Sequence, residues 1–222
     1  MWLVLPISLI YLLSPFMSKF KTIGMSTTDR FLKRFFDLAV AIGGLTFSAP
    51  VILLCWLIAA IETRSNGFFI HERIGQYGTV IKVYKIKTMY ESTRSSSSIA
   101  SQNRFRITKS GLFFRYWKLD ELPQLFNVLS GSMSVVGPRP DIPGYADRLN
   151  DEDRIILLLR PGITGPASIK YRNEEEILAA VDDAVLYNDT VIWPDKVMIN
   201  KGYINNYSFM TDVKYALQTF IH

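Results

Sequence analysis

The sequence predicts an α+β protein attached to a membrane, on three observations. An apolar run covers residues 37–61, two segments around a short turn cover residues 68–89, and an aromatic-rich helical pattern begins at Arg104. An apolar run of about 25 residues can cross a bilayer as a helix, and two such segments, the second strictly alternating, indicate a β-hairpin. We therefore expect one membrane helix, one hairpin and a small helical domain.

Composition limits the partners of this chain. Its 222 residues suffice for one core, 49% of them are hydrophobic, and the net charge is +5. A basic chain favours an acidic partner, which leaves anionic lipid, nucleic acid and phosphorylated small molecules open. Cys55 is the only cysteine, and His71 and His222 are the only histidines. An intrachain disulfide is therefore excluded, and a zinc or redox role has no support.

Residues 1–29 form an apolar N-terminal extension with three interpretations. The stretch 2–17 carries no charge, contains two prolines and follows no basic residue. It is short for a membrane span and atypical of a signal peptide, and both remain open. The third interpretation, which we favour, is translated sequence upstream of a start at Met25, where a polar stretch precedes the next apolar run.

Residues 30–64 contain the longer apolar run, with Pro50 at its centre. Proline removes one helical hydrogen bond, and the Ser48 hydroxyl can donate to the carbonyl that loses its partner. Charged residues flank the run on both sides, so the positive-inside rule gives no orientation. Two structures fit the pattern. One is a kinked transmembrane helix, and the other is a helix that breaks at Ser48, Ala49 and Pro50 and returns to the side from which it entered.

The hairpin is predicted from the segments Phe68–Gly75 and Thr79–Met89, around a turn at Gln76–Gly78. In the second segment, one set of alternate positions holds Val80, Lys82, Tyr84 and Ile86, and the other holds Ile81, Val83, Lys85 and Lys87. The serine-rich stretch 92–102 that follows is typical of a mobile loop.

The rest of the chain is helical in pattern. Residues 112–118 mix aromatic and cationic side chains, which fits a core helix with a basic edge or a helix lying in the headgroup region of a membrane. Residues 196–220 offer a similar choice between a surface-lying helix and a terminal packing helix. No nucleic-acid-binding module is recognisable, and the apolar run also argues against a nucleic-acid partner.

Asp120 and Glu121 are the candidate catalytic residues. An isolated Asp120 would simply cap the helix expected over residues 123–129, which Gly131 ends. Capping predicts neither a second carboxylate nor the basic residues that precede the pair. Adjacent carboxylates repel each other, so they favour Mg²⁺ together with phosphates. One carboxylate can then coordinate the metal while the other attacks phosphorus.

Arg139 lies between Pro138 and Pro140, and proline fixes its own φ and restricts the residue before it. This stiff backbone suits a guanidinium that grips a phosphate, although a rigid surface loop with an incidental arginine has the same pattern. A second corner at residues 160–166 combines Arg160 with glycines that let a phosphate approach the backbone.

Taken in order, these motifs resemble the monotopic phosphoglycosyl transferases, bacterial sugar transferases that load the first sugar phosphate onto a polyprenol phosphate carrier. The resemblance covers residues 30–172 and depends on the order and spacing of the motifs. They are Lys33-Arg34-x-x-Asp37, Phe68-Phe69-x-x-Glu72-Arg73-x-Gly75, Tyr84-Lys85-x-x-Thr88-Met89, Leu119-Asp120-Glu121-Leu122-Pro123-Gln124-Leu125, Asn127-Val128-Leu129, Gly137-Pro138-Arg139-Pro140 and Arg160-Pro161-Gly162-Ile163-Thr164-Gly165.

The resemblance implies a monotopic protein of the minimal type. Residues 30–64 would form a re-entrant membrane helix broken at the proline, and residues 65–222 a cytoplasmic catalytic domain with interfacial amphipathic helices. It implies a place at the cytoplasmic face of the bacterial inner membrane, with membrane lipids as partners. The sequence leaves oligomeric state open, and a homo-oligomer is compatible with it.

The resemblance also implies a two-step reaction that starts a surface glycan such as capsule, exopolysaccharide or O-antigen. Asp120 would attack the β-phosphate of a UDP-sugar, release UMP and pass the phosphosugar to polyprenol phosphate. The metal site would hold Mg²⁺ on Glu121 and Asp120. The substrate-binding residues would be Arg115, Arg139, Pro138, Pro140, Lys87, Arg160 and Arg172.

The chain departs from the family pattern in places. Ala49 replaces a usual serine, Lys87 a usual arginine, Ser132 a usual aspartate, and Pro166-Ala167-Ser168 the commoner Trp-Ala-Gln. The last change indicates a different sugar or subfamily. A rival hypothesis is a catalytically silent, membrane-bound scaffold of a glycan assembly complex. It does not need the acidic pair, yet both carboxylates are intact.

Overall fold

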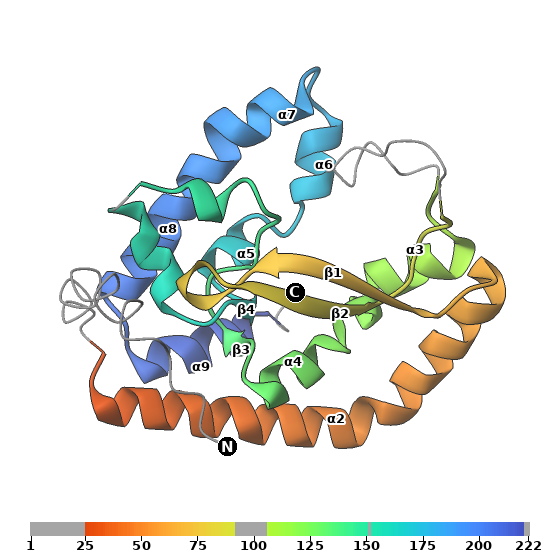
Figure 1. Ribbon diagram of the computed structural model, residues 1–222, viewed down its shortest axis with the longest axis horizontal. Coiled ribbons are helices and arrows are strands. Elements are labelled where there is room, and N and C mark those ends of the chain that lie inside the picture. The colour runs from red at the N-terminus through yellow and green to blue at the C-terminus, as the bar shows by residue number, and fades with distance from the viewer. Residues whose placement is uncertain (1–24, 92–105, 151, 220–222) are drawn as a thin grey trace, which may run out of the picture.

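The computed structural model describes residues 25–91, 106–150 and 152–219. The N-terminal apolar segment up to residue 24 and the serine-rich stretch 92–102 lie outside these residues, so their interpretations stay predictions. The described chain holds one long helix, a β-hairpin, and then a series of short helices with a small parallel strand pair among them (Figure 1). The long helix runs along one side of the molecule, and the other elements lie above it in this view.

The long helix, α2, spans Thr27–Thr63 and begins with a capping box, because the side chains of Ser26 and Asp29 each accept a backbone N–H of the other. It ends at Arg64, which adopts a left-handed conformation. Among the described helices, α2 is the one that is long and apolar enough to cross a membrane by length and composition.

α2 is continuous across Pro50 rather than interrupted there. It runs along the lower edge of the molecule and then bends toward the far end of the hairpin (Figure 1). Pro50 has no N–H to donate to the carbonyl of Thr46, which is a sufficient cause of a bend. Ser48 does not compensate as expected, because its buried Oγ makes no hydrogen bond with any described residue. The expected break is thus a bend, and the return to one membrane face stays a prediction.

Both ends of α2 are attached to the helical part of the chain. Near its start, Lys33 Nζ donates to the carbonyl of Val136 at 2.7 Å, and Asp37 accepts the N–H of Val135 at 2.8 Å. Near its end, Glu62 accepts the N–H of Lys109 at 2.9 Å. Between these anchors α2 leaves large apolar side chains exposed, namely Ile42, Phe47, Val51, Leu53, Leu54, Leu57, Ile58 and Ile61.

The hairpin forms where the alternation predicts it. β1 spans Phe68–Ile74 and β2 spans Val80–Ile86, paired antiparallel around a short helical turn at Gln76–Gly78. The second strand is shorter than expected, since Met89 contributes only an isolated bridge to Ile107. Opposed residues share a face, so one face carries Phe69, His71 and Arg73 of β1 with Lys85, Val83 and Ile81 of β2.

After the hairpin come α3 (Lys109–Tyr116), a 3₁₀ turn at Leu119–Glu121 and α4 (Gln124–Ser130). The strands β3 (Ser134–Val136) and β4 (Gly162–Thr164) form a parallel pair that the sequence did not predict. The segment that follows β3 is bonded to β4 through the backbone. The Gly137 N–H donates to the carbonyl of Thr164, and the Gly162 N–H donates to the carbonyl of Pro138. A Cβ at Gly137 would lie 2.4 Å from the carbonyl oxygen of Arg160, so only glycine permits this approach.

The C-terminal part consists of short helices that pack on the strand pair and on the start of α2. They are 3₁₀ turns at Ala146–Arg148 and Asp153–Leu158, α5 (Pro166–Lys170), α6 (Glu174–Ala179), α7 (Ala184–Tyr187), a π-helical turn at Asn188–Ile192, α8 (Trp193–Asn205) and α9 (Phe209–Gln218). The single helical segment expected from residue 196 is therefore two helices. Val197, Tyr203 and Ile204 of α8 are buried in the main core, which favours the packing interpretation.

Candidate active site

The acidic pair lies in a tight turn between α3 and α4. Lys118, in the left-handed region at φ 55°, begins the 3₁₀ turn at Leu119–Glu121. The turn buries Asp120, whose residue is 8% exposed. Asp120 does not cap α4 as the simple interpretation expected, because no side-chain capping bond forms there. Gly131, at φ 86°, ends α4 as predicted.

Glu121 is held by two cations from different parts of the fold. Its Oε1 accepts from Lys85 Nζ at 2.8 Å and from Arg139 Nη2 at 2.5 Å. Burial would raise the pKa of this carboxyl, but the two cations outweigh burial and hold the pKa well below its usual range. Glu121 is therefore an anion at neutral pH, fixed in place by the hairpin on one side and the Pro-Arg-Pro loop on the other.

Asp120 differs from its neighbour. Its Oδ1 is buried and has no hydrogen-bond partner among the described residues. Burial raises the pKa of Asp120, and the charge of Glu121 adds to this, while Lys85, Arg115 and Lys118 oppose it. A buried carboxylate oxygen without a partner costs free energy, so its retention indicates a ligand or a reacting group. Two adjacent carboxylates thus have different environments, which is the arrangement expected when they have different roles.

The structure brings only part of the predicted substrate-binding set to the acidic pair. Arg139 contacts Glu121 directly, between buried Pro138 and Pro140. Arg115, at the end of α3, is close enough to Asp120 to act on its pKa, and it forms an ion pair with Glu175 of α6.

The other predicted cations have different partners. Lys87 donates to Ser65 Oγ at 2.8 Å and to Glu91 at 2.9 Å. Arg172 donates to the carbonyl of Thr219 at 3.0 Å, so it caps the end of α9. Arg160 lies just before β4, and its side chain makes no hydrogen bond or ion pair with Asp120 or Glu121. Phosphate binding by these three residues stays a prediction.

Sequence reasoning missed two cations on the hairpin. Lys85 contacts Glu121, and Arg73 lies on the same face of the hairpin by register. Burial lowers the pKa of Arg73 to about 10, and Arg139 lowers it too, so the two guanidinium groups lie close together. The alternation of the second strand could have indicated Lys85, because Lys85 lies on the same face of the strand as the buried Val83. A lysine at such a position is expected to meet a buried anion.

A magnesium site fits these residues only as a site completed by substrate. Within residues 25–91, 106–150 and 152–219, no group of three or more histidine, cysteine or acidic side chains could hold a metal ion. Mg²⁺ is usually held by one or two carboxylates together with substrate phosphates and water. Asp120 Oδ1 has no partner among the described residues, whereas Glu121 Oε1 already accepts from Lys85 and Arg139. Magnesium binding by this pair therefore stays a prediction.

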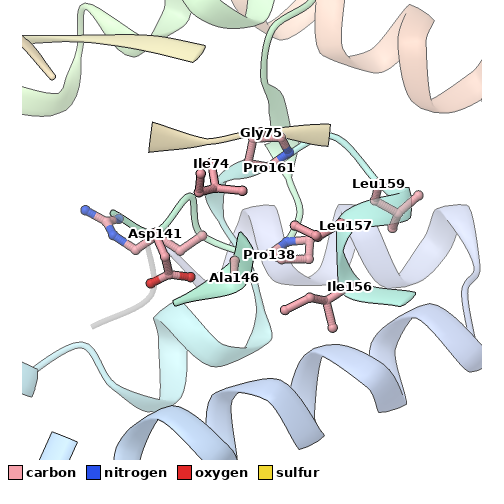
Figure 2. A pocket seen from close by; sticks show the side chains of 10 residues that line it. Ile74, Gly75, Pro138, Asp141, Ala146, Ile156, Leu157, Leu159 and Pro161 are labelled. Carbon is pink, nitrogen blue, oxygen red and sulfur yellow. The ribbon is translucent and has the colours of Figure 1, made fainter. Parts of the chain in front are cut away.

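A pocket adjoins Arg139. It is lined by Ile74, Gly75, Pro138, Arg139, Asp141, Ala146, Ile156, Leu157, Leu159 and Pro161. Figure 2 shows the carboxylate of Asp141 at one end of this lining and the apolar side chains of Ile156, Leu157 and Leu159 toward the other. The lining is thus apolar with a few polar groups, around a space of about 10 Å³, which is roughly that of one water molecule.

The chain is similar to known bacterial sugar transferases. Residues 28–222 match a family described as Bacterial sugar transferase. A protein of Bacillus subtilis (strain 168) called uncharacterized sugar transferase EpsL is 33% identical over 183 residues, which is 82% of this chain and 82% of that protein. The UDP-glucose:undecaprenyl-phosphate glucose-1-phosphate transferase of Escherichia coli (strain K12) is 34% identical over 202 residues. The undecaprenyl-phosphate galactose phosphotransferase of Salmonella typhimurium is 30% identical over 210 residues. The aligned parts are 83% and 86% of this chain, but only 43% and 40% of these two relatives.

Proposed function

Because the chain belongs to the bacterial sugar transferase family, we propose that it transfers a sugar 1-phosphate from a UDP-sugar to undecaprenyl phosphate and releases UMP. Relatives named for reactions of this kind support the proposal. The structural observation that carries it is the acidic pair. Asp120 has a buried oxygen with no partner in the part of the chain that the structure describes, beside a glutamate that two cations hold in place.

The first step is an attack by Asp120. A carboxylate oxygen of Asp120 forms a bond to the β-phosphorus of the UDP-sugar, and the bond from that phosphorus to the oxygen bridging the two phosphates breaks. UMP leaves with the bonding electrons, and the sugar phosphate stays on Asp120 as an acyl phosphate. The absence of a hydrogen bond to Asp120 Oδ1 supports this role, because a nucleophile that already accepted such bonds would be less reactive.

The second step returns the enzyme to its starting state. A phosphate oxygen of undecaprenyl phosphate attacks the same phosphorus, and the bond to Asp120 breaks, which gives undecaprenyl-diphosphate-sugar. Glu121 and Asp120 would hold Mg²⁺, which neutralises charge on the diphosphate when bound. Arg139 and Lys85 are bonded to Glu121 beside Asp120, and Arg73 lies on the same hairpin face as Lys85. Their positive charges would stabilise the charge that develops in the transition state.

The arrangement of α2 supports attachment to one face of a membrane, which for this reaction is the cytoplasmic face of the inner membrane. The helical part of the chain holds both ends of α2, through Lys33 at the start and Glu62 at the end. A helix that crossed a bilayer completely would carry its two ends to opposite sides. In the arrangement on one face, the exposed apolar side chains of α2, such as Phe47 at 85% exposure, would lie in the lipid.

α3 supports the same placement. Leu112, Phe113, Tyr116 and Trp117 are exposed, and Phe114 packs in a core cluster that includes part of α2. The exposed side of α3 thus carries aromatic side chains together with the cation Lys109, and exposed Lys118 follows the helix. Tyrosine and tryptophan favour the headgroup region of a membrane, so we place α3 there, next to the acidic pair. A lipid-linked phosphate could reach Asp120 from that region.

The direct test is UMP release from a panel of UDP-sugars with undecaprenyl phosphate and Mg²⁺. We expect release with at least one UDP-sugar, dependent on the lipid phosphate for continued turnover. Release with none of them would contradict the proposal and favour the silent scaffold.

A further inference from the structure

Asp141 directly follows the Pro138-Arg139-Pro140 corner, and its backbone is fixed from two sides. The Asp141 carbonyl accepts the N–H of Ile74 on β1 at 2.8 Å. The Pro138 carbonyl accepts the N–H of Gly162 at 2.8 Å. The corner is therefore bound to the hairpin and to the parallel strand pair, and the position of the Asp141 side chain is determined by a stiff backbone.

The Asp141 carboxylate lines the pocket beside Arg139 but forms no hydrogen bond or ion pair with any residue that the structure describes. Burial raises its pKa to about 6, and Lys196, Arg73 and Arg139 lie close enough to oppose that effect. The group is thus largely ionised at neutral pH, with its acceptor positions open. Neighbouring carboxylates differ, since Glu121 and Glu174 both have direct cationic partners.

The unpaired carboxylate of Asp141 suits a ligand group that donates hydrogen bonds. Arg139 is bonded to Glu121 beside Asp120, and Arg73 is near enough for its charge to act on both Arg139 and Asp141. The phosphates of a substrate that reacts at Asp120 would be attracted to these guanidinium groups. A carboxylate beside a bound diphosphate cannot face another anion, so the adjacent ligand group must donate hydrogen bonds. In a nucleotide sugar, the groups beside the diphosphate that donate are the hydroxyls of the sugar on one side and of the ribose on the other.

We propose that Asp141 is a substrate-binding residue that accepts hydrogen bonds from hydroxyl groups of the nucleotide sugar, next to the diphosphate. The inference rests on the proposed function and extends it to the residue that follows the Gly137-Pro138-Arg139-Pro140 motif. If the sugar hydroxyls are the donors, Asp141 helps to choose the sugar. If the ribose hydroxyls are the donors, Asp141 helps to hold every UDP-sugar alike.

The test compares Asp141→Asn and Asp141→Ala with the unchanged protein. Asp182→Asn is the matched control, because Asp182 is exposed and has no partner in the described chain. For each protein, KM and kcat of UMP release are measured with a panel of UDP-sugars that differ at single hydroxyl groups, and the inhibition constant of UMP is measured as well. Thermal unfolding of each variant confirms that it is folded.

We expect Asp141→Asn and Asp141→Ala to raise KM for the preferred UDP-sugar by about tenfold or more, as for loss of a hydrogen bond to a charged group. If sugar hydroxyls are the donors, the Asp141 variants show no rise in KM for the UDP-sugar that lacks the relevant hydroxyl, and their inhibition by UMP is unchanged. With ribose hydroxyls as donors, KM rises equally for all UDP-sugars and UMP inhibits less. Folded variants whose KM values and UMP inhibition stay within about twofold of the control would overturn the inference. An unchanged protein that releases no UMP would overturn the proposed function, and this inference with it.

Discussion

Arg139 Nη2 lies 2.5 Å from Glu121 Oε1, which joins two sequence motifs separated by a whole helix and strand. The stiff Pro-Arg-Pro corner therefore holds a guanidinium against the residue beside the candidate nucleophile. The same carboxylate also accepts from Lys85, so hairpin, turn and corner converge on one anion.

Replacing the guanidinium tests whether its shape matters as well as its charge. Arg139→Lys keeps the charge but loses the planar fork that can hold a carboxylate and a phosphate together. We expect kcat/KM for UMP release to fall by about thirtyfold, from a loss of about 2 kcal/mol. Arg148→Lys is the control, because Arg148 is exposed in a short turn. Equal activity of the two variants would show that Arg139 is only a structural partner of Glu121.

A second prediction concerns the buried pair between α2 and α9. Lys33 Nζ lies 2.6 Å from Asp212 Oδ2, and both side chains are almost inaccessible, at 8% and 0% exposure. Removing one partner leaves an uncompensated buried charge, so Lys33→Met should lower the free energy of unfolding by about 3–5 kcal/mol.

Lys201→Met is the matched control for that prediction. Lys201 pairs with Asp153 at 2.6 Å, but both side chains are about one-third exposed, so the loss of this pair should lower stability far less than the loss of the Lys33 pair. Thermal or denaturant unfolding in detergent measures both variants. If the two lost the same stability, the Lys33 pair could not be what anchors the start of α2.

The pKa of Asp141 leads to a prediction about stability. Burial raises that pKa from 3.8 to about 6, so the folded state holds its proton more tightly than the unfolded state does. The free energy of unfolding therefore falls as pH rises from about 4 to 6 and stays lower above that window. Asp141→Asn removes the titrating group, and its effect should be to stabilise the protein at pH 7, by up to about 3 kcal/mol.

Unfolding curves at several pH values check this prediction. The gain in stability from Asp141→Asn should disappear near pH 4, where the native aspartic acid is itself neutral. A gain of the same size at pH 4 and pH 7 would show that charge is not its cause. Greater stability combined with a higher KM would be the trade-off expected of a binding residue that the fold alone does not need.

The path of α2 can be tested by labelling its ends. Arg30→Cys and Arg64→Cys, each in a Cys55→Ala background, place a single thiol at an exposed position before and after the apolar part of the helix. In sealed inverted membrane vesicles, an impermeant thiol reagent should label both variants equally. Labelling of only one of them would mean that α2 crosses the bilayer completely.

Much of the local structure follows from the sequence because it depends on neighbouring residues. Alternation predicts the hairpin, and a glycine at position 131 ends α4 because it accepts a positive φ. The parallel pair of β3 and β4 could not be foreseen in this way. Strands of three residues have little pattern of their own, and this pair exists because Gly137 and Gly162 allow two backbones to meet.

The contacts of individual cations are harder to predict, because charge alone does not say which anion a side chain meets. Arg172 donates to the carbonyl of Thr219 at the end of α9, and phosphate binding by Arg172 stays a prediction. Lys85 was not chosen, yet it contacts Glu121. Both outcomes depend on contacts between segments far apart in the chain, and only the hairpin register would have indicated the second one.

In the proposed mechanism, Asp120 becomes bonded to the sugar phosphate. The most direct measurement is the intact mass of the protein after incubation with a reactive UDP-sugar and Mg²⁺, without undecaprenyl phosphate, alongside UMP release. The mechanism predicts one added sugar phosphate on the unchanged protein and on Asp182→Asn. It predicts no adduct on Asp120→Asn, with UMP release lower by at least about a thousandfold. An Asp120→Asn protein that still carries the adduct, or that releases UMP at the normal rate, would contradict it.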